Sequence, residues 1–414
     1  MLNQNNEREL SYLVKVDAIT PMNADRLECA HIGGWHCVVS KGEFKVGDPA
    51  VYFEIDSQLP DVEPFSSMEF LKSKDFKIKT QKIRGEYSQG LLMPISAFGW
   101  TFDDTQFCGG VDVIRDSDGN IHLLDDESRF LTKILNVTYS TIGDNFRKSN
   151  GVDKYKKMAQ RHPNIFKRRW ARWLMKRTWG KKLLFLFFGK AKDKKSDWPY
   201  WVVKTDEERI QNCGFMLNLD TKWIATEKID GSSTTFTLYG DKFLVCSRNV
   251  VFNTPSKEDK CFYDTNIYTE MAEKYCMKDK MKEALKDVRN YIGKEIKFIT
   301  IQAETYGSGV QKRDYGLKEH DMAIFNVIFG CADGHVERLN PIDGKEFADK
   351  YQLPYVPVIS EAMTLPTVVE EVVAMADGKS EIDGGMREGI VFRSIDGTHS
   401  FKSVSNEFLI KYHG

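Results

Sequence analysis

The sequence has no apolar run long enough to cross a membrane. Its longest, residues 183–188, has six residues, whereas a spanning helix needs about 20. The first ten residues, MLNQNNEREL, are polar and no apolar stretch follows them, so we expect no secretory leader. These features predict a cytoplasmic protein that does not insert into membranes.

Closely spaced cysteines are also missing. The eight cysteines are Cys29, Cys37, Cys108, Cys213, Cys246, Cys261, Cys276 and Cys331. They include no Cys-x-x-Cys pair, whereas disulfide frameworks and cysteine-based zinc sites normally contain such pairs. We therefore expect reduced thiols, which behave as ordinary small buried side chains.

The net charge is only −1, but the charges are unevenly distributed. Residues 147–195 contain 18 Lys and Arg and only two acids, which leaves 41 basic and 58 acidic residues elsewhere. Within this segment Trp170 and Trp173 lie at helical spacing among arginines and lysines, which predicts a basic amphipathic helix. Such a helix can grip a nucleic-acid backbone, dock on a neighbouring domain or lie on an anionic membrane.

The length and the strand patterns predict a multidomain α+β protein. A chain of 414 residues is too long for one ordinary core. Residues 1–100 contain short β-branched and aromatic runs separated by glycine turns, which fits an OB-type or an SH3-like β-barrel. Residues 198–414 mix strands and helices irregularly, as in α+β domains. Residues 101–197 would form a connecting region that carries the basic segment.

The tripeptide Ile-Asp-Gly occurs at residues 229–231, 342–344, 382–384 and 395–397. An Asp-Gly pair favours a turn, and we expect a turn at the last three copies. Only the first copy follows a lysine, Lys228. A lysine amine is a nucleophile only when deprotonated, which burial and nearby positive charge favour. Lys228 is therefore a candidate for covalent capture of a phosphoryl group, although Lys-x-Asp-Gly alone is a weak signal.

Further motifs along the chain support this candidate. They are EKIDGS at residues 227–232, SRN at 247–249, IQAETYG at 301–307, MAIFNVIF at 322–329, EGIVFR at 388–393 and FKSVSN at 401–406. In this order they resemble motifs I, Ia, III, IIIa, IV and V of the covalent nucleotidyltransferase superfamily, which contains ATP-dependent ligases and mRNA-capping enzymes.

A closer resemblance connects most of the chain to one branch of ATP-dependent RNA ligases. The segment KTDEERIQN at residues 204–212 is similar to the lead-in of that branch, and residues 23–60 and 82–96 also resemble it. The resemblance is weakest between residues 101 and 196. It implies an OB-type β-barrel over residues 1–100, followed by an ATP-grasp-like adenylyltransferase (ligase) domain built on antiparallel sheets over residues 198–414.

The resemblance also implies the roles of individual residues. Lys228 would attack the α-phosphorus of ATP and hold AMP as a phosphoramidate. Glu388 would coordinate Mg²⁺ or Mn²⁺, which prefer carboxylate oxygens. The other nucleotide-binding residues would be Glu227 at the adenine edge, Phe325 (or Met322 in another alignment frame) stacked on adenine, Glu304 at the ribose hydroxyls, and Arg209, Arg248 and Lys402 at phosphates. Arg209 would engage either the nucleotide phosphate or the incoming 5′-phosphate end.

Motif V departs from the pattern of the family. It normally carries two lysines separated by one residue, but the positions two residues from Lys402 are Ser400 and Val404. One phosphate-binding lysine is therefore missing, although Lys402 alone can neutralise the α-phosphate. This departure keeps open a nucleic-acid-binding relative that has lost catalysis.

The function implied by the resemblance is ATP-dependent RNA ligation. The protein would join 3′-OH and 5′-phosphate ends through lysyl-AMP and RNA-adenylate, as a monomer acting in RNA repair on breaks in duplex or folded RNA. A DNA ligase or a capping guanylyltransferase would use the same chemistry, but the N-terminal position of the barrel argues against both. An NAD⁺-dependent ligase is disfavoured because its nicotinamide-binding helices are not evident.

Overall fold

The computed structural model describes eight stretches of the chain: residues 1–4, 7–103, 112–124, 127–139, 198–202, 206–252, 265–291 and 295–413. The chain divides into two compact units, Met1–Thr138 with Trp198–Gly414, and Tyr139–Asp197. The predicted basic segment 147–195 lies outside the described residues, so its helix stays a prediction, as do the domain boundaries at residues 100 and 197. Within the described part of the chain, no helix is long and apolar enough to cross a membrane.

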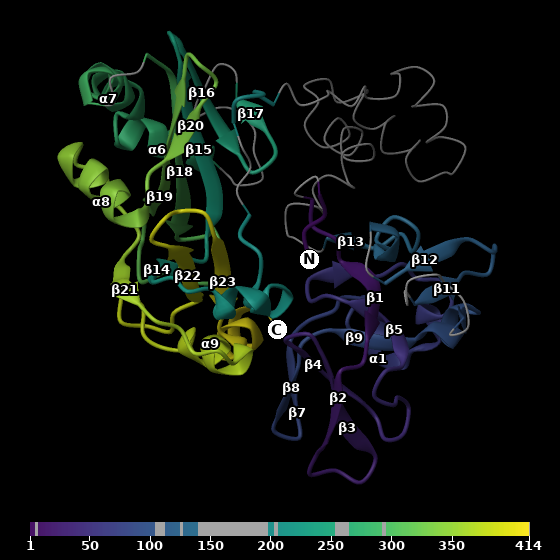
Figure 1. Ribbon diagram of the computed structural model, residues 1–414. Helices are drawn as coiled ribbons and strands as arrows, with labels where there is room; N and C mark the ends of the chain where they lie inside the picture. The colour runs from purple at the N-terminus through teal and green to yellow at the C-terminus, as the bar shows by residue number, and fades with distance from the viewer. Residues whose placement is uncertain are drawn as a thin grey trace, which may run out of the picture. The chain divides into compact units, whose positions relative to one another are not determined.

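The N-terminal region consists of short antiparallel strands, as its β-branched and aromatic runs predict. One sheet has the order β1–β5–β9, with β1 (Ser11–Lys15), β5 (Pro49–Phe53) and β9 (Leu91–Pro94). A second sheet contains β2 (Ala18–Pro21), β3 (Leu27–Ile32) and β4 (Trp35–Ser40). A third contains β7 (Gln81–Ile83) and β8 (Glu86–Ser88). A fourth contains β10 (Thr101–Asp103), β11 (Val113–Arg115) and β12 (Ile121–Leu123). The remaining elements are β6 (Ser57–Gln58), α1 (Glu69–Lys72) and β13 (Thr138–Tyr139). Figure 1 shows these strands in purple and blue.

A hydrophobic core joins the N-terminal strands to the C-terminal end of the chain. Trp35 and Tyr52 are buried in it, with ring centroids 5.7 Å apart. Val404 and Leu409, from the opposite end of the sequence, belong to the same buried cluster. The N-terminal strands are therefore held by apolar burial against the segment that follows motif V.

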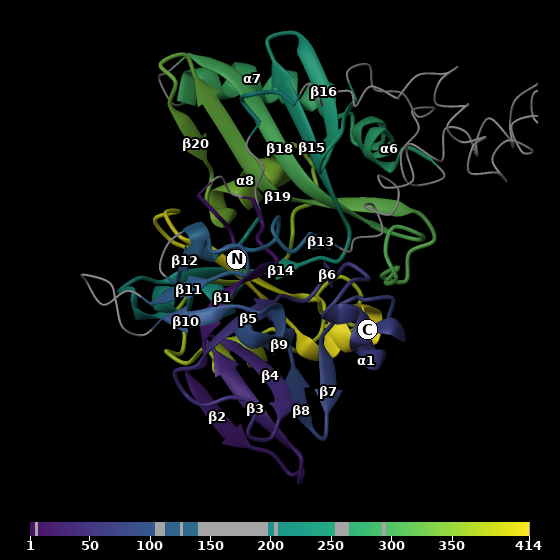
Figure 2. The same ribbon diagram turned by 90° about the vertical axis from the view of Figure 1, so that its right-hand side faces the viewer.

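The C-terminal region contains a six-stranded antiparallel sheet covered by helices (Figure 2). Its order is β17–β16–β15–β18–β19–β20, with β15 (Ser232–Tyr239), β16 (Lys242–Ser247), β17 (Val251–Phe252), β18 (Ile296–Gly307), β19 (His320–Cys331) and β20 (Val336–Arg338). Helices α6 (Ile267–Lys274), α7 (Met277–Tyr291) and α8 (Pro341–Lys350) bury apolar side chains against it. The α+β class and the antiparallel sheets predicted from the sequence are confirmed.

A second antiparallel sheet carries the candidate lysine. Its order is β21–β14–β22–β23, with β21 (Val358–Met363), β14 (Trp223–Lys228), β22 (Gly389–Ser394) and β23 (Ser400–Val404). Lys228 ends β14, and the chain then turns into β15 of the six-stranded sheet. Gly231 in this turn has no room for a side chain, because a Cβ there would lie 2.4 Å from the carbonyl oxygen of Thr305. The lysine therefore stands where the two sheets meet.

The three other Ile-Asp-Gly copies differ in structure. Gly397 has a φ of 73° in the hairpin turn between β22 and β23, and Gly384 has a φ of 69° in the loop before β22. Both are turns, as predicted. The prediction was wrong for residues 342–344, which form the first turn of α8. The Asn340 side chain accepts hydrogen bonds from two backbone amides of that turn, and Pro341 occupies its start, which are strong helix-initiating features.

Two short helices complete the C-terminal region. They are α9 (Val369–Met375) and α10 (Asn406–Phe408). The Ser403 hydroxyl donates to the Val372 carbonyl at 3.0 Å, and the Ser405 hydroxyl donates to the Asp377 carboxylate at 2.5 Å. Helix α9 is therefore tied by hydrogen bonds to the strand that carries motif V.

Candidate active site

Lys228 and Glu388 face each other at the end of the four-stranded sheet. Lys228 pairs with Gly389 across β14 and β22, and its Nζ donates to the two Glu388 carboxylate oxygens at 2.7 and 2.8 Å. Burial alone would lower the pKa of Lys228, but Glu388, followed by Glu304 and Asp230, raises it above its usual value. The amine is therefore protonated near neutral pH in the ligand-free protein, and burial does not activate it in this state.

Three carboxylates surround this single amine. Burial raises the pKa of Glu304, at the end of β18, to about 8; Lys228 opposes the shift, while Glu388 and Asp230 add to it. Asp230 Oδ1 lies 3.3 Å from His413 Nε2, whereas Asp230 Oδ2 is buried and has no hydrogen-bond partner. These oxygen donors fit a hard divalent cation such as Mg²⁺ or Mn²⁺.

Lys402 and Arg248, both predicted to bind phosphate, share one carboxylate. Lys402 Nζ donates to Asp206 Oδ1 at 2.9 Å, and an Arg248 guanidinium nitrogen donates to Asp206 Oδ2 at 2.5 Å. Burial would raise the pKa of Asp206, but Lys402 and then Arg248 hold it well below its usual range. Burial lowers the pKa of Lys402, although Asp206 opposes this. The two cations thus converge on one anion, as they would on a phosphate.

Arg209 lies beside Lys402 along the backbone. The two residues form an isolated parallel bridge, and the Lys402 amide donates to the Glu208 carbonyl at 2.7 Å. The buried Arg209 side chain reaches the N-terminal region, where a guanidinium nitrogen lies 3.9 Å from Asp56 Oδ2. Its Nε is buried and has no hydrogen-bond partner. Arg209, whose backbone lies next to motif V, therefore has one buried N–H group that makes no hydrogen bond.

Glu227 and Phe325 are the two residues predicted to contact the adenine base. Glu227 is 1% exposed; its Oε2 accepts from the Glu381 amide at 2.8 Å, while its Oε1 is buried without a partner. Burial raises the pKa of Glu227. Phe325 is half-buried beside Ile229, whereas Met322 is fully buried in the core of the six-stranded sheet. Of the two alignment frames, only the one with Phe325 leaves a partly exposed side chain for stacking.

Motif V has no second cation in the position that the family uses. Val404 is 2% exposed and packs in the core shared with the N-terminal strands. Instead, Arg8 lies near enough to lower the pKa of both Lys402 and Asp206. Sequence reasoning missed Arg8 and Asp206. Asp206 lies within the lead-in segment that resembles the family, but no local pattern singles out Arg8.

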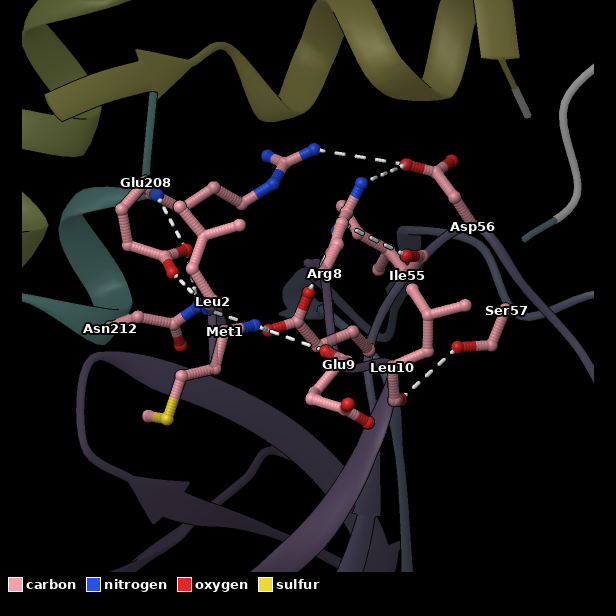
Figure 3. A network of polar contacts seen from close by, with 12 residues as sticks. Met1, Leu2, Arg8, Glu9, Leu10, Ile55, Asp56, Ser57, Glu208 and Asn212 are labelled. Atoms are coloured by element: carbon pink, nitrogen blue, oxygen red, sulfur yellow. Dashed lines mark hydrogen bonds and ion pairs between the residues drawn. The ribbon is translucent and has the colours of Figure 1, made fainter. Parts of the chain in front are cut away.

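A buried polar network connects the N-terminal region to the lead-in segment (Figure 3). Glu54 Oε2 accepts from Arg8 at 3.1 and 3.2 Å, and Glu54 Oε1 accepts from Asn212 at 2.9 Å. Asn212 also donates to Glu208 at 2.8 Å, and the Tyr12 hydroxyl donates to Glu54 at 3.0 Å. Buried polar groups satisfied in this way fix one arrangement of their partners. Arg209, between Glu208 and Asn212, is positioned by this network.

Comparisons with known proteins agree with the geometry. A family model of an OB-fold domain matches residues 10–95, and a family model named RNA ligase matches residues 221–413. Curated protein sequences gave no significant match. Among solved structures, an RNA ligase of Naegleria gruberi with PPi superposes with a TM-score of 0.66 at 25% identity, covering 98% of this chain and 99% of that one. A lysine-to-alanine variant of the same ligase with ATP and Mn gives a TM-score of 0.67 at 25% identity, again covering 98% and 99%.

The comparisons also decide between the alternatives for the two regions. The N-terminal match is to an OB-fold domain, and not to an SH3-like barrel. The C-terminal match contains motifs I to V and follows the OB-fold domain in the chain. The predicted order of the two regions is therefore confirmed. Residues 221–413 therefore form an RNA ligase domain, and an OB-fold domain precedes it in the chain.

Proposed function

We propose that the protein seals RNA breaks with 3′-OH and 5′-phosphate ends through a lysyl-AMP intermediate, with ATP as the nucleotide. The observation that carries this proposal is the position of Lys228 at the junction of two sheets. There its Nζ contacts Glu388, and Glu304 and Asp230 lie close enough to shift its pKa. The solved relatives of Naegleria gruberi, which contain ATP with Mn or AMP with Mn, support ATP and a divalent metal as cofactors.

The chemistry follows from one amine and a series of displacements at phosphorus. Lys228 Nζ attacks the α-phosphorus of ATP; a P–N bond forms, the bond to the bridging oxygen breaks and pyrophosphate leaves. An oxygen of the RNA 5′-phosphate then displaces the lysine and forms a 5′–5′ phosphoanhydride. Finally, the 3′-OH attacks the 5′-phosphorus, forms a phosphodiester and releases AMP.

Lys228 must lose a proton before the first step. In the ligand-free protein its carboxylate partners favour the charged form. Glu304, whose pKa is raised to about 8, can hold a proton near neutral pH. If Glu388 contacts a divalent cation instead of Lys228, the lysine loses its closest negative partner and its pKa falls.

Glu388 would hold the divalent cation, with Glu304 and Asp230 contributing charge around it. When bound, Mg²⁺ or Mn²⁺ neutralises the charge that builds on the α-phosphate. The buried Asp230 oxygen without a hydrogen-bond partner would be a further oxygen donor close to this cation.

The remaining side chains would bind the nucleotide. Arg248 and Lys402 would contact the phosphates through the groups that now meet Asp206. Arg209 would do so through its guanidinium, whose buried Nε has no hydrogen-bond partner. Glu227 offers a buried acceptor to the adenine amino group, and Phe325 offers a ring face for stacking. Glu304 would accept from the ribose hydroxyls.

We propose RNA broken within duplex or folded regions as the substrate, and a cytoplasmic monomer as the active form. The 18 basic residues of segment 147–195 support a grip on the phosphate backbone that is independent of sequence. An enzyme that repairs RNA breaks needs such a grip, because the breaks occur in many sequences.

Labelling with α-³²P-ATP tests the proposal. In the presence of Mg²⁺ or Mn²⁺ we expect acid-stable label on the wild-type protein and none on Lys228→Ala, because only Lys228 forms the phosphoramidate. Absence of label on the wild type, or label that persists on Lys228→Ala, would contradict the adenylylation step.

A second candidate function is RNA binding without sealing, which the buried valine at position 404 favours. A nicked RNA duplex with a 5′-phosphate separates the two functions. Sealed product supports the ligase, whereas bound RNA with neither labelled protein nor sealed product supports the relative that has lost catalysis.

A further inference from the structure

We propose that His31, His36 and Glu370 form a binding site for a divalent transition-metal ion, with Zn²⁺ as the ion that best fits the donors. The site joins the β3–β4 hairpin of the OB-fold region to helix α9 of the ligase region. It shares no residue with the candidate active site, and it does not depend on the proposed function.

The three donors already lie close together. One donor atom from each residue lies within 4.8 Å of the other two, the only such trio of His, Cys, Asp or Glu among the described residues. His36 Nε2 is 3.0 Å from Glu370 Oε1, and the rings of His31 and His36 are 4.3 Å apart. Tetrahedral Zn²⁺ with bonds of about 2.0–2.1 Å separates its ligand atoms by about 3.4 Å. The Glu370 side chain is 51% exposed, so it can rotate to bring its carboxylate to this spacing from the two imidazole nitrogens.

The hairpin holds both imidazoles in place. His31 and His36 are directly opposite each other in the antiparallel pair of β3 and β4. Thr20 Oγ1, on the adjacent strand β2, lies 2.8 Å from His31 Nε2. A hydrogen bond to a ligating imidazole orients its ring and fixes its tautomer. Two nitrogen donors are thus presented on a rigid element, where metal sites are best preorganised.

Backbone contacts hold the turn of the same hairpin close to Glu370. The Gly34 amide donates to the Gln211 carbonyl at 3.1 Å. A Cβ at Gly34 would lie 2.7 Å from Gln211 Cα and 2.7 Å from Val369 Cγ1. Val369 immediately precedes Glu370 at the start of α9. The backbone contact therefore brings the glutamate to the histidines without help from a metal, so binding requires little reorganisation.

The charges around the site favour a cation. Three carboxylates, those of Glu370, Glu86 and Asp17, lie near enough to act electrostatically on His31. A cation at this point would be attracted by all three carboxylates.

The donor set indicates the kind of metal. Two imidazoles and one carboxylate suit Zn²⁺ and neighbouring first-row ions, whereas Mg²⁺ prefers oxygen donors and retains its water. Three protein ligands leave a fourth position for water. Because the ligands come from two regions of the chain, the bound ion would cross-link the OB-fold region to α9.

The test measures metal binding by the full-length protein after treatment with a chelator. Isothermal titration with Zn²⁺ in buffer free of Mg²⁺ and Mn²⁺ should show one site, and His36→Ala and Glu370→Gln should each weaken it by at least about tenfold. Co²⁺ substituted for Zn²⁺ should give the absorption bands of a tetrahedral site. Zn²⁺ should also raise the Tm of the wild type, because a ligand that binds only the folded state stabilises it.

Matched variants separate this site from surface binding. Glu371→Gln changes the adjacent exposed glutamate of α9, and His335→Ala removes a histidine that belongs to no such trio; both should bind Zn²⁺ like the wild type. Circular dichroism of each variant without metal checks that it is folded. No stoichiometric binding by the wild type would overturn the site. Binding that survives in Glu370→Gln would contradict the cross-link to α9, because the histidines alone would then hold the ion.

Discussion

At the scale of single residues, Asp206 stands where a nucleotide phosphate is expected. Its two carboxylate oxygens each accept from a different cation, Lys402 and Arg248. A triphosphate must therefore replace this carboxylate before it can use both cations. In the ligand-free protein one carboxylate of the lead-in segment thus offsets part of the positive charge of the two cations, and we expect nucleotide binding to compete with it.

Removing the charge of Asp206 should tighten nucleotide binding. Asp206→Asn keeps the shape of the side chain but weakens its hold on both cations, so we expect the KM for ATP in the labelling reaction to fall about threefold to tenfold. Asp241→Asn, in an exposed turn, is the matched control and should leave the KM unchanged. An unchanged or higher KM in Asp206→Asn would show that the carboxylate does not compete with the phosphates.

The protonation state of Lys228 predicts the pH dependence of adenylylation. Its pKa is raised in the ligand-free site, chiefly by Glu388 against the effect of burial, so the neutral amine is scarce at neutral pH. The single-turnover rate of label incorporation should therefore rise from about pH 6 to about pH 9, as more of the amine becomes neutral. A rate that is flat or falls over this range would show that another step limits the reaction or that Lys228 is already neutral.

At the scale of elements, the lead-in segment links the two regions through alternating side chains. Glu207 accepts from Arg338 and Arg393 of the ligase region at 3.0 and 3.4 Å. Glu208 instead accepts from Asn212, which in turn donates to Glu54 of the OB-fold region. Consecutive carboxylates thus anchor the segment to different partners, and they fix the backbone of Arg209, which follows them.

Glu54 should give the interface between these elements a marked acid sensitivity. Burial would raise its pKa, but the α-amino group of Met1 and then Arg8 lower it from 4.5 to about 2. A lowered pKa in the folded state stabilises the protein above the unfolded value, and this stabilisation is lost as the pH falls from about 4.5 to about 2. Glu54→Gln should lower the free energy of unfolding at pH 7 by about 3 kcal/mol or more, because it leaves buried positive charge without its partner.

Urea unfolding at several pH values measures both effects. The wild type should lose stability over the acid range more steeply than Glu54→Gln. Glu69→Gln removes an exposed i,i+3 ion pair with Lys72 and should change stability by less than about 1 kcal/mol. Equal stability of Glu54→Gln and the wild type at pH 7 would contradict a structural role for this carboxylate.

At the scale of the whole molecule, charge is concentrated in one segment of an otherwise acidic chain. Residues 147–195 carry an excess of 16 positive charges, whereas the rest of the chain carries an excess of 17 negative charges. The segment lies outside the described residues, and its function is open between RNA binding, docking and a membrane surface. Salt dependence distinguishes these, because contacts with RNA phosphates release counterions.

Neutralising part of this segment should weaken RNA binding and spare adenylylation. Replacing Arg168, Arg169 and Arg172 with glutamine should reduce the slope of log K against log salt concentration by up to about 2. The same three positions changed to lysine keep the charge and should retain most of the slope. Unchanged binding in the glutamine variant would assign the segment to docking or to a membrane surface.

The sequence predicts the parts of the site that lie at the ends of strands. Lys228, Glu304 and Glu388 were assigned from motif order, and strand pairing brings all three to the junction of the two sheets. Contacts between distant segments could not be predicted in this way. Asp206 meets Arg248 and Lys402, 42 and 196 residues away, and no periodicity or local propensity encodes such pairs. Residues 342–344 were misassigned because the helix cap at Asn340 outweighs the turn preference of Asp-Gly.

Gly231 has a further consequence for how the site opens. Its backbone lies against the Thr305 carbonyl so closely that no Cβ fits between them, and Thr305 directly follows Glu304. The turn that follows Lys228 and the strand that carries Glu304, the proposed ribose-binding carboxylate, are thus in direct backbone contact, and we expect them to move together. We therefore expect the spacing between Lys228 and Glu304 to change little when a nucleotide binds.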